Sequence, residues 1–264
     1  MKQTLFRTFL VLVLMTSTLV LPGRTLAAAP DAEDIMKKAD AHRYDADDSK
    51  FSISLVMKEK GGDTRTRKLS MQSRKSGRDK KILIHFLEPS DVRGVGFMVW
   101  QYPKKDDERW LYIPSLHMVK RIAANDKRSS FMGTDFTYED ISGREVEEDK
   151  HEYVKSEKLK GEDCYVIKST PRDTGSAEFA YRLSWVRKDN YFTVQEQYFD
   201  KKEKLIKIYT VDELEKVQGL WTIKRMTMKN VQTDHSTAVT YSDVKHNTGI
   251  PDSNFTERYL KRMP

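Results

Sequence analysis

The sequence predicts a mainly β protein in which one antiparallel sheet curls into a half-open barrel with helices at its mouth. Three observations favour this fold class. Many short segments alternate apolar and polar side chains and are separated by turns rich in Asp, Gly, Asn, Lys or Pro. Helical spacing of apolar residues occurs only near the two ends of the mature chain. Two strands are apolar on both faces, and such a sheet must curl around a helix layer or a ligand.

The composition is that of an ordinary folded protein. Of the 264 residues, 38% are hydrophobic and 33% are charged, which excludes a disordered or fibrous chain. Cys164 is the single cysteine, so an internal disulfide is excluded. The length fits one large β domain or two small ones, and we favour a single domain over residues 28–264.

The first residues have the layout of a secretory signal peptide. Lys2 and Arg7 precede a short apolar run, which small residues follow. We expect cleavage after Ala27, although cleavage after Ala29 also fits the small-residue rule. A retained membrane anchor is the alternative, and the short, interrupted apolar run disfavours it. The mature protein is therefore expected to be exported and soluble, and loss of residues 1–27 lowers its formal charge from +7 to +4.

The charge and the motifs exclude several classes of function. An exported protein rarely meets nucleic acid, and no DNA- or RNA-binding motif is present, so the basic charge favours an anionic membrane surface or an acidic protein as partner. The six histidines lack metal-ligand spacing, and no cofactor-binding motif is found. No activated-nucleophile motif is found either, so we expect neither a metal, nor a cofactor, nor an enzyme.

The mature chain begins with a predicted helix over 31–44. Asp31 can cap its first turn, and its apolar residues share one face at helical spacing. Segment 51–57 then alternates, and a Gly-Gly pair turns the chain into 64–73, which predicts a hairpin.

The remaining elements continue the same alternation to the end of the chain. Strands are predicted at 80–87, 96–102, 109–113, 117–122, 152–159, 164–170, 181–187, 193–199, 204–211, 221–229 and 237–244. Such a succession indicates an antiparallel meander. A short helix is expected within 251–262, where Phe255, Tyr259 and Leu260 have helical spacing.

Two strands have apolar side chains on both faces. In 96–102, Phe97 and Val99 lie on one face, and Met98, Trp100 and Tyr102 lie on the other. In 109–113 both faces are again apolar. A half-open barrel with helices in its mouth explains this pattern, and a closed barrel filled by its own side chains explains it equally well.

The densest pattern of aromatic and charged residues lies between positions 100 and 140. Its most specific positions are Pro114, Arg121, Ser130, Phe131, Gly133, Thr134, Asp135, Phe136 and Asp140. With these residues the chain resembles the outer-membrane lipoprotein-sorting protein family, in the LolA-like group of larger periplasmic proteins. The resemblance extends from the signal peptide through the terminal strands.

This resemblance implies a strongly curved antiparallel sheet, an unclosed half-barrel, whose concave apolar side holds acyl chains beneath a helical lid. It also implies a monomeric periplasmic carrier of a lipoprotein or lipid, with an inner-membrane transporter as donor and an outer-membrane acceptor. The chain is longer than the short lipoprotein chaperones, so a lipoprotein, a free lipid and a hopanoid-like molecule all stay open as cargo. The alternatives are a lipid- or lipoprotein-sensing module and an accessory of a lipid-exporting transporter. A periplasmic hydrolase is disfavoured.

Large apolar residues on these strands and loops are the candidate lining of the acyl cavity. They are Phe51, Ile53, Met98, Trp100, Tyr102, Trp110, Tyr112, Phe131, Phe136 and Trp185. For each of them the alternative is an ordinary core position, because alternation fixes which residues share a face but not which face is concave.

Two further sets of residues are candidates for a lid and for docking. Segment 128–140 is a candidate gate whose charged and flexible positions are Arg128, Gly133, Asp135 and Asp140; a rigid packed connection is the alternative.

The basic run between 65 and 81 is a candidate docking surface for anionic headgroups or an acidic transporter, through Arg65, Arg67, Arg74, Lys75 and Arg78. The alternative there is a solvated strand pair whose cations discourage edge-to-edge association.

Overall fold

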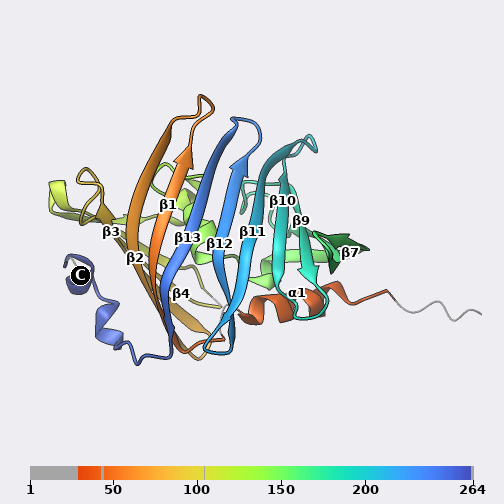
Figure 1. The fold of residues 1–264 in the computed structure, drawn as a ribbon, viewed down its shortest axis with the longest axis horizontal. Helices are drawn as coiled ribbons and strands as arrows, with labels where there is room; N and C mark the ends of the chain where they lie inside the picture. The colour runs from red at the N-terminus through yellow and green to blue at the C-terminus, as the bar shows by residue number, and fades with distance from the viewer. Residues whose placement is uncertain (1–28, 43–44, 104, 263–264) are drawn as a thin grey trace, which may run out of the picture.

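The computed structural model describes residues 29–42, 45–103 and 105–262 (Figure 1). Its strands are β1 (Asp48–Lys58), β2 (Thr64–Ser76), β3 (Asp79–Glu88), β4 (Gly96–Gln101), β5 (Glu108–Ile113), β6 (Met118–Ile122), β7 (Asp149–Leu159), β8 (Glu162–Pro171), β9 (Tyr181–Arg187), β10 (Thr193–Phe199), β11 (Leu205–Val217), β12 (Leu220–Asn230) and β13 (His235–His246). Each predicted strand segment overlaps one of these strands. The predicted signal peptide lies outside the described residues.

Helices are few and short. The α-helices are α1 (Ala32–Ala41), α2 (Tyr138–Ser142) and α3 (Glu257–Leu260), and the 3-10 helices are η2 (Pro114–Leu116), η3 (Ala124–Arg128), η4 (Val146–Glu148) and η5 (Asp252–Asn254). The sequence predicts α1 and a helix near α3. It does not predict α2, a helix of five residues whose N-cap is Thr137.

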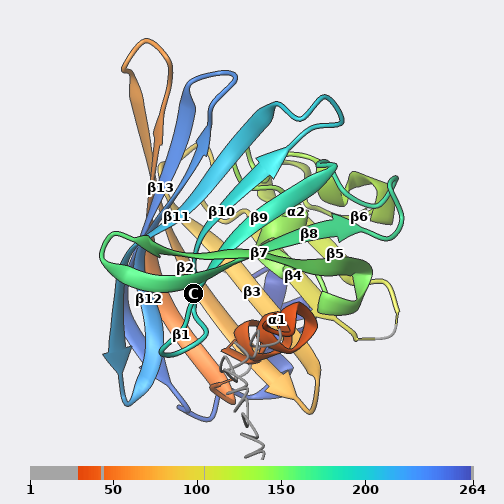
Figure 2. The same ribbon diagram turned by 90° about the vertical axis from the view of Figure 1, so that its right-hand side faces the viewer.

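All the strands form one antiparallel sheet that does not close. The strand order is β6-β5-β4-β3-β2-β1-β13-β12-β11-β10-β9-β8-β7, so the first strand pairs with the last in the middle of the sheet. The two edges, β6 and β7, follow each other in the chain. The segment 123–148 that joins them must therefore pass from one edge of the curved sheet to the other. Figure 2 shows α1 and α2 within the hollow of the sheet. The predicted fold class, a mainly β protein with an unclosed antiparallel sheet, is confirmed.

The N-terminal helix α1 covers part of the hollow. The Asp31 side chain accepts hydrogen bonds from the backbone N–H of Glu33 (2.9 Å) and of Asp34 (3.2 Å), which begins the helix. Its apolar face, with Ile35 and Met36, packs in one buried cluster with side chains of η4, β8 and β9. The helix is thereby held over the β7 side of the opening.

The concave face of strands β1 to β5 carries the main hydrophobic core. Inward-facing residues such as Ile53, Ile84 and Phe97 pack against Phe131 and Tyr138 of the segment that joins β6 to β7. The ring of Phe131 lies 5.2 Å from that of Phe97 and 5.5 Å from that of Tyr138, each in an edge arrangement. This segment is therefore the layer that covers the inner face of these strands.

The outer face of the same strands is covered by the C-terminal tail. Met98 and Trp110 form a buried cluster with the tail residues Phe255 and Leu260. A Cβ atom added at Gly96 would lie 2.6 Å from Leu260 Cδ1, so only glycine permits this close approach of the tail to β4. The two-faced apolar strands therefore lie between two protein layers.

Candidate functional site

A cavity of about 450 Å³ lies between the concave face of the sheet and α1. Its volume is in the range of about 300–1,000 Å³ that is typical of small-molecule sites. Its walls come from α1, from β1 to β3, from β9 to β13 and from the segment that contains α2. The lining residues on which the description below depends are Met36, Ala39, Ser49, Phe51, Met71, Arg74, Ile82, Phe136, Asp140, Arg144, Arg182, Glu196, Tyr198, Tyr209, Met226, Met228, Tyr241 and His246.

The middle of the cavity is apolar and aromatic. Phe51 of β1 and Tyr241 of β13 face each other with ring centroids 5.5 Å apart. Tyr209 and Met226 lie beside them, and the Tyr241 hydroxyl points at the Met226 sulfur, 4.0 Å away. Burial raises the pKa of the Tyr209 and Tyr241 phenols, so both stay neutral at ordinary pH. This lining suits an aliphatic or sterol-like group and offers few fixed polar partners.

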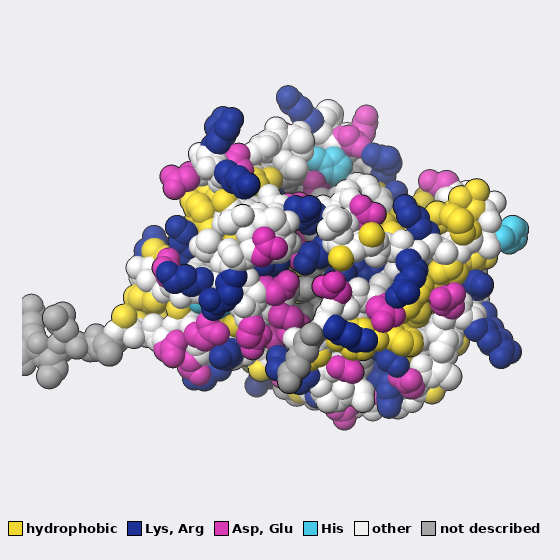
Figure 3. Space-filling model, turned by 180° about the vertical axis from the view of Figure 1, so that it is seen from behind, with side chains coloured by type: hydrophobic (Ala, Val, Ile, Leu, Met, Phe, Trp, Pro, Cys, Tyr) yellow, Lys and Arg dark blue, Asp and Glu magenta, His cyan; other side chains and the backbone are white. Residues whose placement is uncertain are grey.

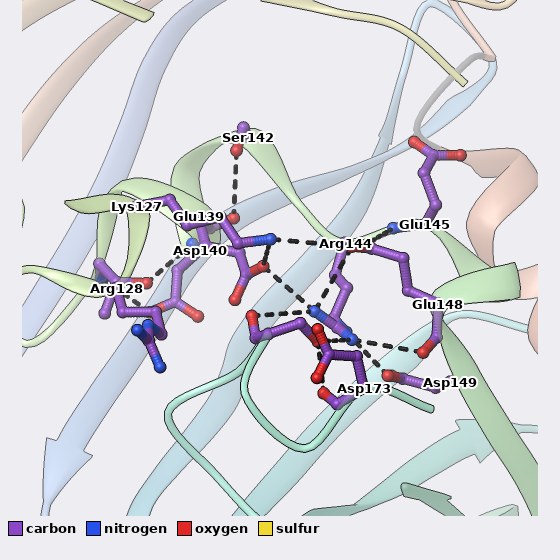
Figure 4. Close-up of polar contacts among 12 residues, drawn as sticks. Lys127, Arg128, Glu139, Asp140, Ser142, Arg144, Glu145, Glu148, Asp149 and Asp173 are labelled. Carbon is purple, nitrogen blue, oxygen red and sulfur yellow. Dashed lines mark hydrogen bonds and ion pairs between the residues drawn. The ribbon is translucent and has the colours of Figure 1, made fainter. Parts of the chain in front are cut away.

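An ion-pair network closes one side of the cavity, around Arg144 (Figure 4). The Arg144 guanidinium donates to Asp149 Oδ1 at 2.7 Å and to Glu139 Oε1 at 3.3 Å. Its other terminal nitrogen donates to the Ser176 hydroxyl at 2.9 Å and to the Glu148 backbone oxygen at 3.3 Å. Arg144 therefore ties the segment before β7 to the β8–β9 connection.

A second ion-pair group joins the same segment to β11. Lys207 Nζ lies 2.8 Å from Asp140 Oδ2 and also pairs with Glu178. Burial by itself would lower the pKa of Lys207, but the charges of Asp140 and Glu178 raise it, so the ammonium stays charged. Both groups hold the segment 123–148 in place. Their carboxylates and cations are paired with each other and do not form an open charged site.

Arg182 of β9 lines the cavity beside this network. Its Nη2 lies 3.4 Å from Asp149 Oδ2, and its Nε lies 3.7 Å from Glu196 Oε1. The Tyr198 hydroxyl donates to Glu196 Oε2 at 2.5 Å. Burial alone would lower the pKa of Arg182, but the neighbouring carboxylates raise it, so the guanidinium is charged. The cavity thus has an apolar middle and a charged, internally neutralised wall.

The β1, β12 and β13 side of the cavity carries a buried histidine. His246 Nδ1 lies 2.8 Å from the Ser49 hydroxyl, and His246 Nε2 lies 3.0 Å from the Thr222 hydroxyl. Burial lowers the pKa of His246, and the charge of Asp48 opposes this shift. His246 is therefore held by two hydroxyl groups. Among the described residues no group of three His, Cys, Asp or Glu side chains is placed to hold a metal ion.

The structure brings only part of the predicted lining into the cavity. Phe51 and Phe136 line it, and Ile53 and Phe131 lie in the core on the same side of the sheet. A ligand contact by any of them stays a prediction.

Six predicted lining residues lie elsewhere, and this differs from the expectation. Met98, Trp100, Trp110 and Tyr112 pack on the outer face under the C-terminal tail, where Trp100 Nε1 donates to the Phe255 backbone oxygen at 3.1 Å. Tyr102, just beyond β4, lies under the Lys105 ammonium, and Trp185 packs with Cys164 and Val166 in a separate cluster. Both faces of β4 are apolar, so the alternation of its side chains does not show which face is concave.

Several lining residues were not predicted from the sequence. Ala39 and Met36 are on the apolar face of α1, which the sequence assigns to packing alone. Lys207 does not line the cavity but pairs with Asp140, which does. It precedes Tyr209 and Val211 at two-residue spacing, so a charged residue on the same strand face as these apolar residues was the available signal. The carboxylate partners of Arg144 lie within five residues of it in the sequence, so the acidic residues around Arg144 were the available signal. The partners of Arg182, Asp149 and Glu196, lie farther away in the sequence and gave no such signal.

The segment 128–140 is fastened at several points. The Phe131 N–H donates to the Phe136 backbone oxygen at 2.7 Å, and both rings are buried. Asp135 Oδ2 accepts from the Thr237 hydroxyl at 2.7 Å and lies 2.7 Å from His235 Nδ1, both on β13. Arg128 donates to the Gly175 backbone oxygen at 2.9 Å. This geometry favours the packed alternative over a gate.

Hydrogen exchange is expected to be the same in this segment with and without lipid. The backbone amides of Phe131 and Asp135 are bonded within the segment or to β13, so they exchange only when the segment opens. Asp135→Ala should accelerate their exchange in both states, since it removes the bonds to His235 and Thr237. Mass spectrometry of peptides from 128–140 tests this, with the exposed turn at 60–63 as the fast-exchanging reference. Protection that changes on lipid addition would instead support a gate.

The candidate docking cations lie at both ends of β2 and have partners. Arg65 pairs with Glu59, and Arg67 donates to the Met132 backbone oxygen. Near the other end, the Arg74 guanidinium donates to the Ile250 backbone oxygen at 2.5 Å.

The last two of these cations are also paired. Lys75 Nζ lies 3.4 Å from Asp47 Oδ1, and Arg78 Nη2 lies 3.7 Å from Glu145 Oε2. Arg65, Lys75 and Arg78 thus face carboxylates, whereas Arg67 and Arg74 contact uncharged backbone oxygens. Membrane docking by it stays a prediction.

The comparisons with known proteins agree on one group. A family model described as "-like: Uncharacterized protein" matches residues 78–262. A DUF1329 family protein from Desulfovibrio piger is 29% identical, with a TM-score of 0.82 over 87% of this chain and 97% of that chain. A structure described as a "putative outer membrane lipoprotein-sorting protein domain", from Vibrio parahaemolyticus, is 30% identical, with a TM-score of 0.82 over 88% of this chain and 98% of that chain.

A third structure supports the fold alone. The LolA superfamily protein NE2245 from Nitrosomonas europaea is 20% identical, with a TM-score of 0.67 over 88% of this chain and 100% of that chain. No curated protein matches the chain. None of the helices within the described ranges has the length and apolar character needed to cross a bilayer.

Proposed function

Because this chain belongs to the family of outer membrane lipoprotein-sorting proteins, we propose that it is a periplasmic carrier, and not an enzyme, that shelters the acyl chains of a lipoprotein or lipid. The donor in this proposal is an inner-membrane transporter, and the acceptor lies at the outer membrane. The observation that carries the proposal is the apolar cavity of about 450 Å³ between the concave face and α1.

The energetics of crossing an aqueous space require such a cavity. A diacyl lipid has on the order of 30 methylenes, and each costs about 0.8 kcal/mol to expose to water. Unprotected transfer would therefore cost more than about 20 kcal/mol. The aliphatic and aromatic side chains of Phe51, Met71, Met226 and Tyr241 provide an apolar surface that offsets this cost.

The helix α1 is the element that we propose to move when cargo enters. A cavity of this size suits a drug-sized group, and a diacyl lipid is larger. α1 contributes Met36 and Ala39 to the wall. It is held by an apolar cluster with η4, β8 and β9, by Lys38 over the Tyr191 ring and by the bond between His42 Nε2 and the Asn190 backbone oxygen (2.7 Å). The opposite wall is a hydrogen-bonded sheet. Displacing α1 therefore enlarges the cavity without breaking any strand pairing.

The variant Ala39→Trp is expected to lower the affinity for a fatty-acid probe by about tenfold or more. Position 39 lies at the cavity wall, and the indole would occupy space that the ligand needs. Affinity can be measured by titration with a fluorescent fatty acid. In parallel, solvent extracts of protein purified without detergent should contain lipid for the wild type and much less for the variant, as measured by mass spectrometry.

The matched control is Ala41→Trp, on the exposed side of the same helix. It adds the same indole outside the cavity, so its probe affinity should equal that of the wild type. Thermal unfolding of both variants shows whether α1 still packs. Equal affinities for the wild type and a folded Ala39→Trp protein would place the ligand outside this cavity, and a wild-type protein free of lipid and of probe binding would refute the carrier function.

A further inference from the structure

The turn between β5 and β6 exposes two large apolar side chains. Leu116 is 62% exposed and Met118 is 44% exposed, whereas the described part of the chain exposes only two other large hydrophobic residues, Val56 and Val154. The turn is well defined: Pro114 begins η2, and His117 adopts the left-handed conformation (φ 49°) that ends it. Leu116 and Met118 therefore flank the point of the turn that faces solvent.

Cations and aromatic rings surround this apolar tip. Lys120 and Arg121 follow Met118 on β6, and both are exposed. The Arg121 guanidinium lies 5.3 Å from the centre of the Trp110 ring and donates to Glu108 at 2.9 Å. Figure 3 shows an apolar patch at the right-hand end of the molecule, with basic and acidic side chains and a histidine at its border. Apolar tips with neighbouring aromatic rings and cations are typical of surfaces that enter a lipid headgroup layer.

The other edge of the sheet lacks this combination. Val154 of β7 is also exposed, but its neighbours form balanced pairs, with Lys150 Nζ 2.8 Å from Glu152 and Lys155 Nζ 2.7 Å from Glu157. A surface with equal numbers of both charges gains little from an anionic membrane. The paired cations near the β2–β3 turn likewise lack an exposed large apolar side chain beside them.

We infer that the β5–β6 tip, residues 114–121, docks on an anionic membrane surface. Leu116 and Met118 enter the headgroup layer and Lys120 contacts the lipid phosphates, while Arg121 is paired with Glu108. This inference goes beyond the proposed carrier function and does not depend on it, because the tip lies outside the cavity and its binding can be measured on vesicles without cargo.

Co-sedimentation with vesicles tests the docking. The wild type should bind vesicles made of equal parts phosphatidylcholine and phosphatidylglycerol, and bind pure phosphatidylcholine more weakly. Added salt should lower the bound fraction, since the Debye length shortens from about 8 Å at physiological salt to about 3 Å at 1 M. The double variant Leu116→Asp/Met118→Asp should bind the anionic vesicles about tenfold or more weakly.

Two further variants locate the contact. Val154→Asp adds one negative charge at an exposed apolar residue of the other edge and should bind like the wild type. The triple variant Arg74→Glu/Lys75→Glu/Arg78→Glu alters the basic β2–β3 region and should lose far less binding than the tip variant. Equal binding by the wild type and a folded tip variant, loss confined to the triple variant, or no wild-type binding to anionic vesicles would each overturn the inference.

Discussion

Replacement of Arg144 by alanine is expected to lower the free energy of unfolding by about 3–5 kcal/mol. The Arg144 side chain is 3% exposed, and its partner Asp149 is fully buried. Removal of the guanidinium leaves Asp149 with Arg182 as its remaining cation, at 3.4 Å, and leaves Glu139 with Lys127. A buried carboxylate that loses its main partner is strongly destabilising, whereas the intact pair contributes little net stability. Urea unfolding monitored by circular dichroism measures the effect.

Two further variants show whether the loss of stability is specific to Arg144 or follows the removal of any arginine. Arg78→Ala removes a guanidinium that is 62% exposed and pairs with Glu145 at 3.7 Å, so it should cost less than about 1 kcal/mol. Asp149→Asn in the Arg144→Ala background removes the uncompensated charge and should restore part of the lost stability. If Arg144→Ala costs no more than Arg78→Ala, the network does not fasten the segment that covers the inner face.

The second large effect is expected at the C-terminal tail, where Phe255→Ala should lower the free energy of unfolding by about 3–5 kcal/mol. Phe255 is fully buried against the outer face of β4 and β5, together with Met98 and Trp110. The substitution removes the phenyl ring and leaves a cavity between the tail and the sheet, while the backbone oxygen that accepts from Trp100 Nε1 is kept. Chemical denaturation measures this change in the free energy of unfolding. The control is Val56→Ala, which alters a partly exposed residue and should have only a small effect.

Ligand binding distinguishes this outer cluster from the cavity. Trp110→Ala should lower stability in the same way and leave the fatty-acid affinity of the folded protein unchanged, because Trp110 is on the outer face. If Trp110→Ala keeps its thermal midpoint but no longer binds the probe, the ligand lies under the tail and the assignment of the two faces is reversed.

The amino-acid sequence predicted local structure well, because local structure depends on near neighbours. The alternation of side chains located the strands, and Asp31 marked the start of α1. The short helix α2 was missed, since its five residues are too few for a periodic pattern, and tertiary contacts such as the bond from Arg109 to Ser142 (2.9 Å) hold it.

The sequence by itself thus determined the strands, their two-faced apolar character and the family resemblance. The tertiary structure alone decided which face is concave. Alternation places Phe97 and Met98 on opposite faces, but the choice between them depends on where 123–148 and the C-terminal tail pack. It also decided that Lys207 meets Asp140 and that Arg182 meets Asp149, because these ion pairs join elements that are distant in the sequence.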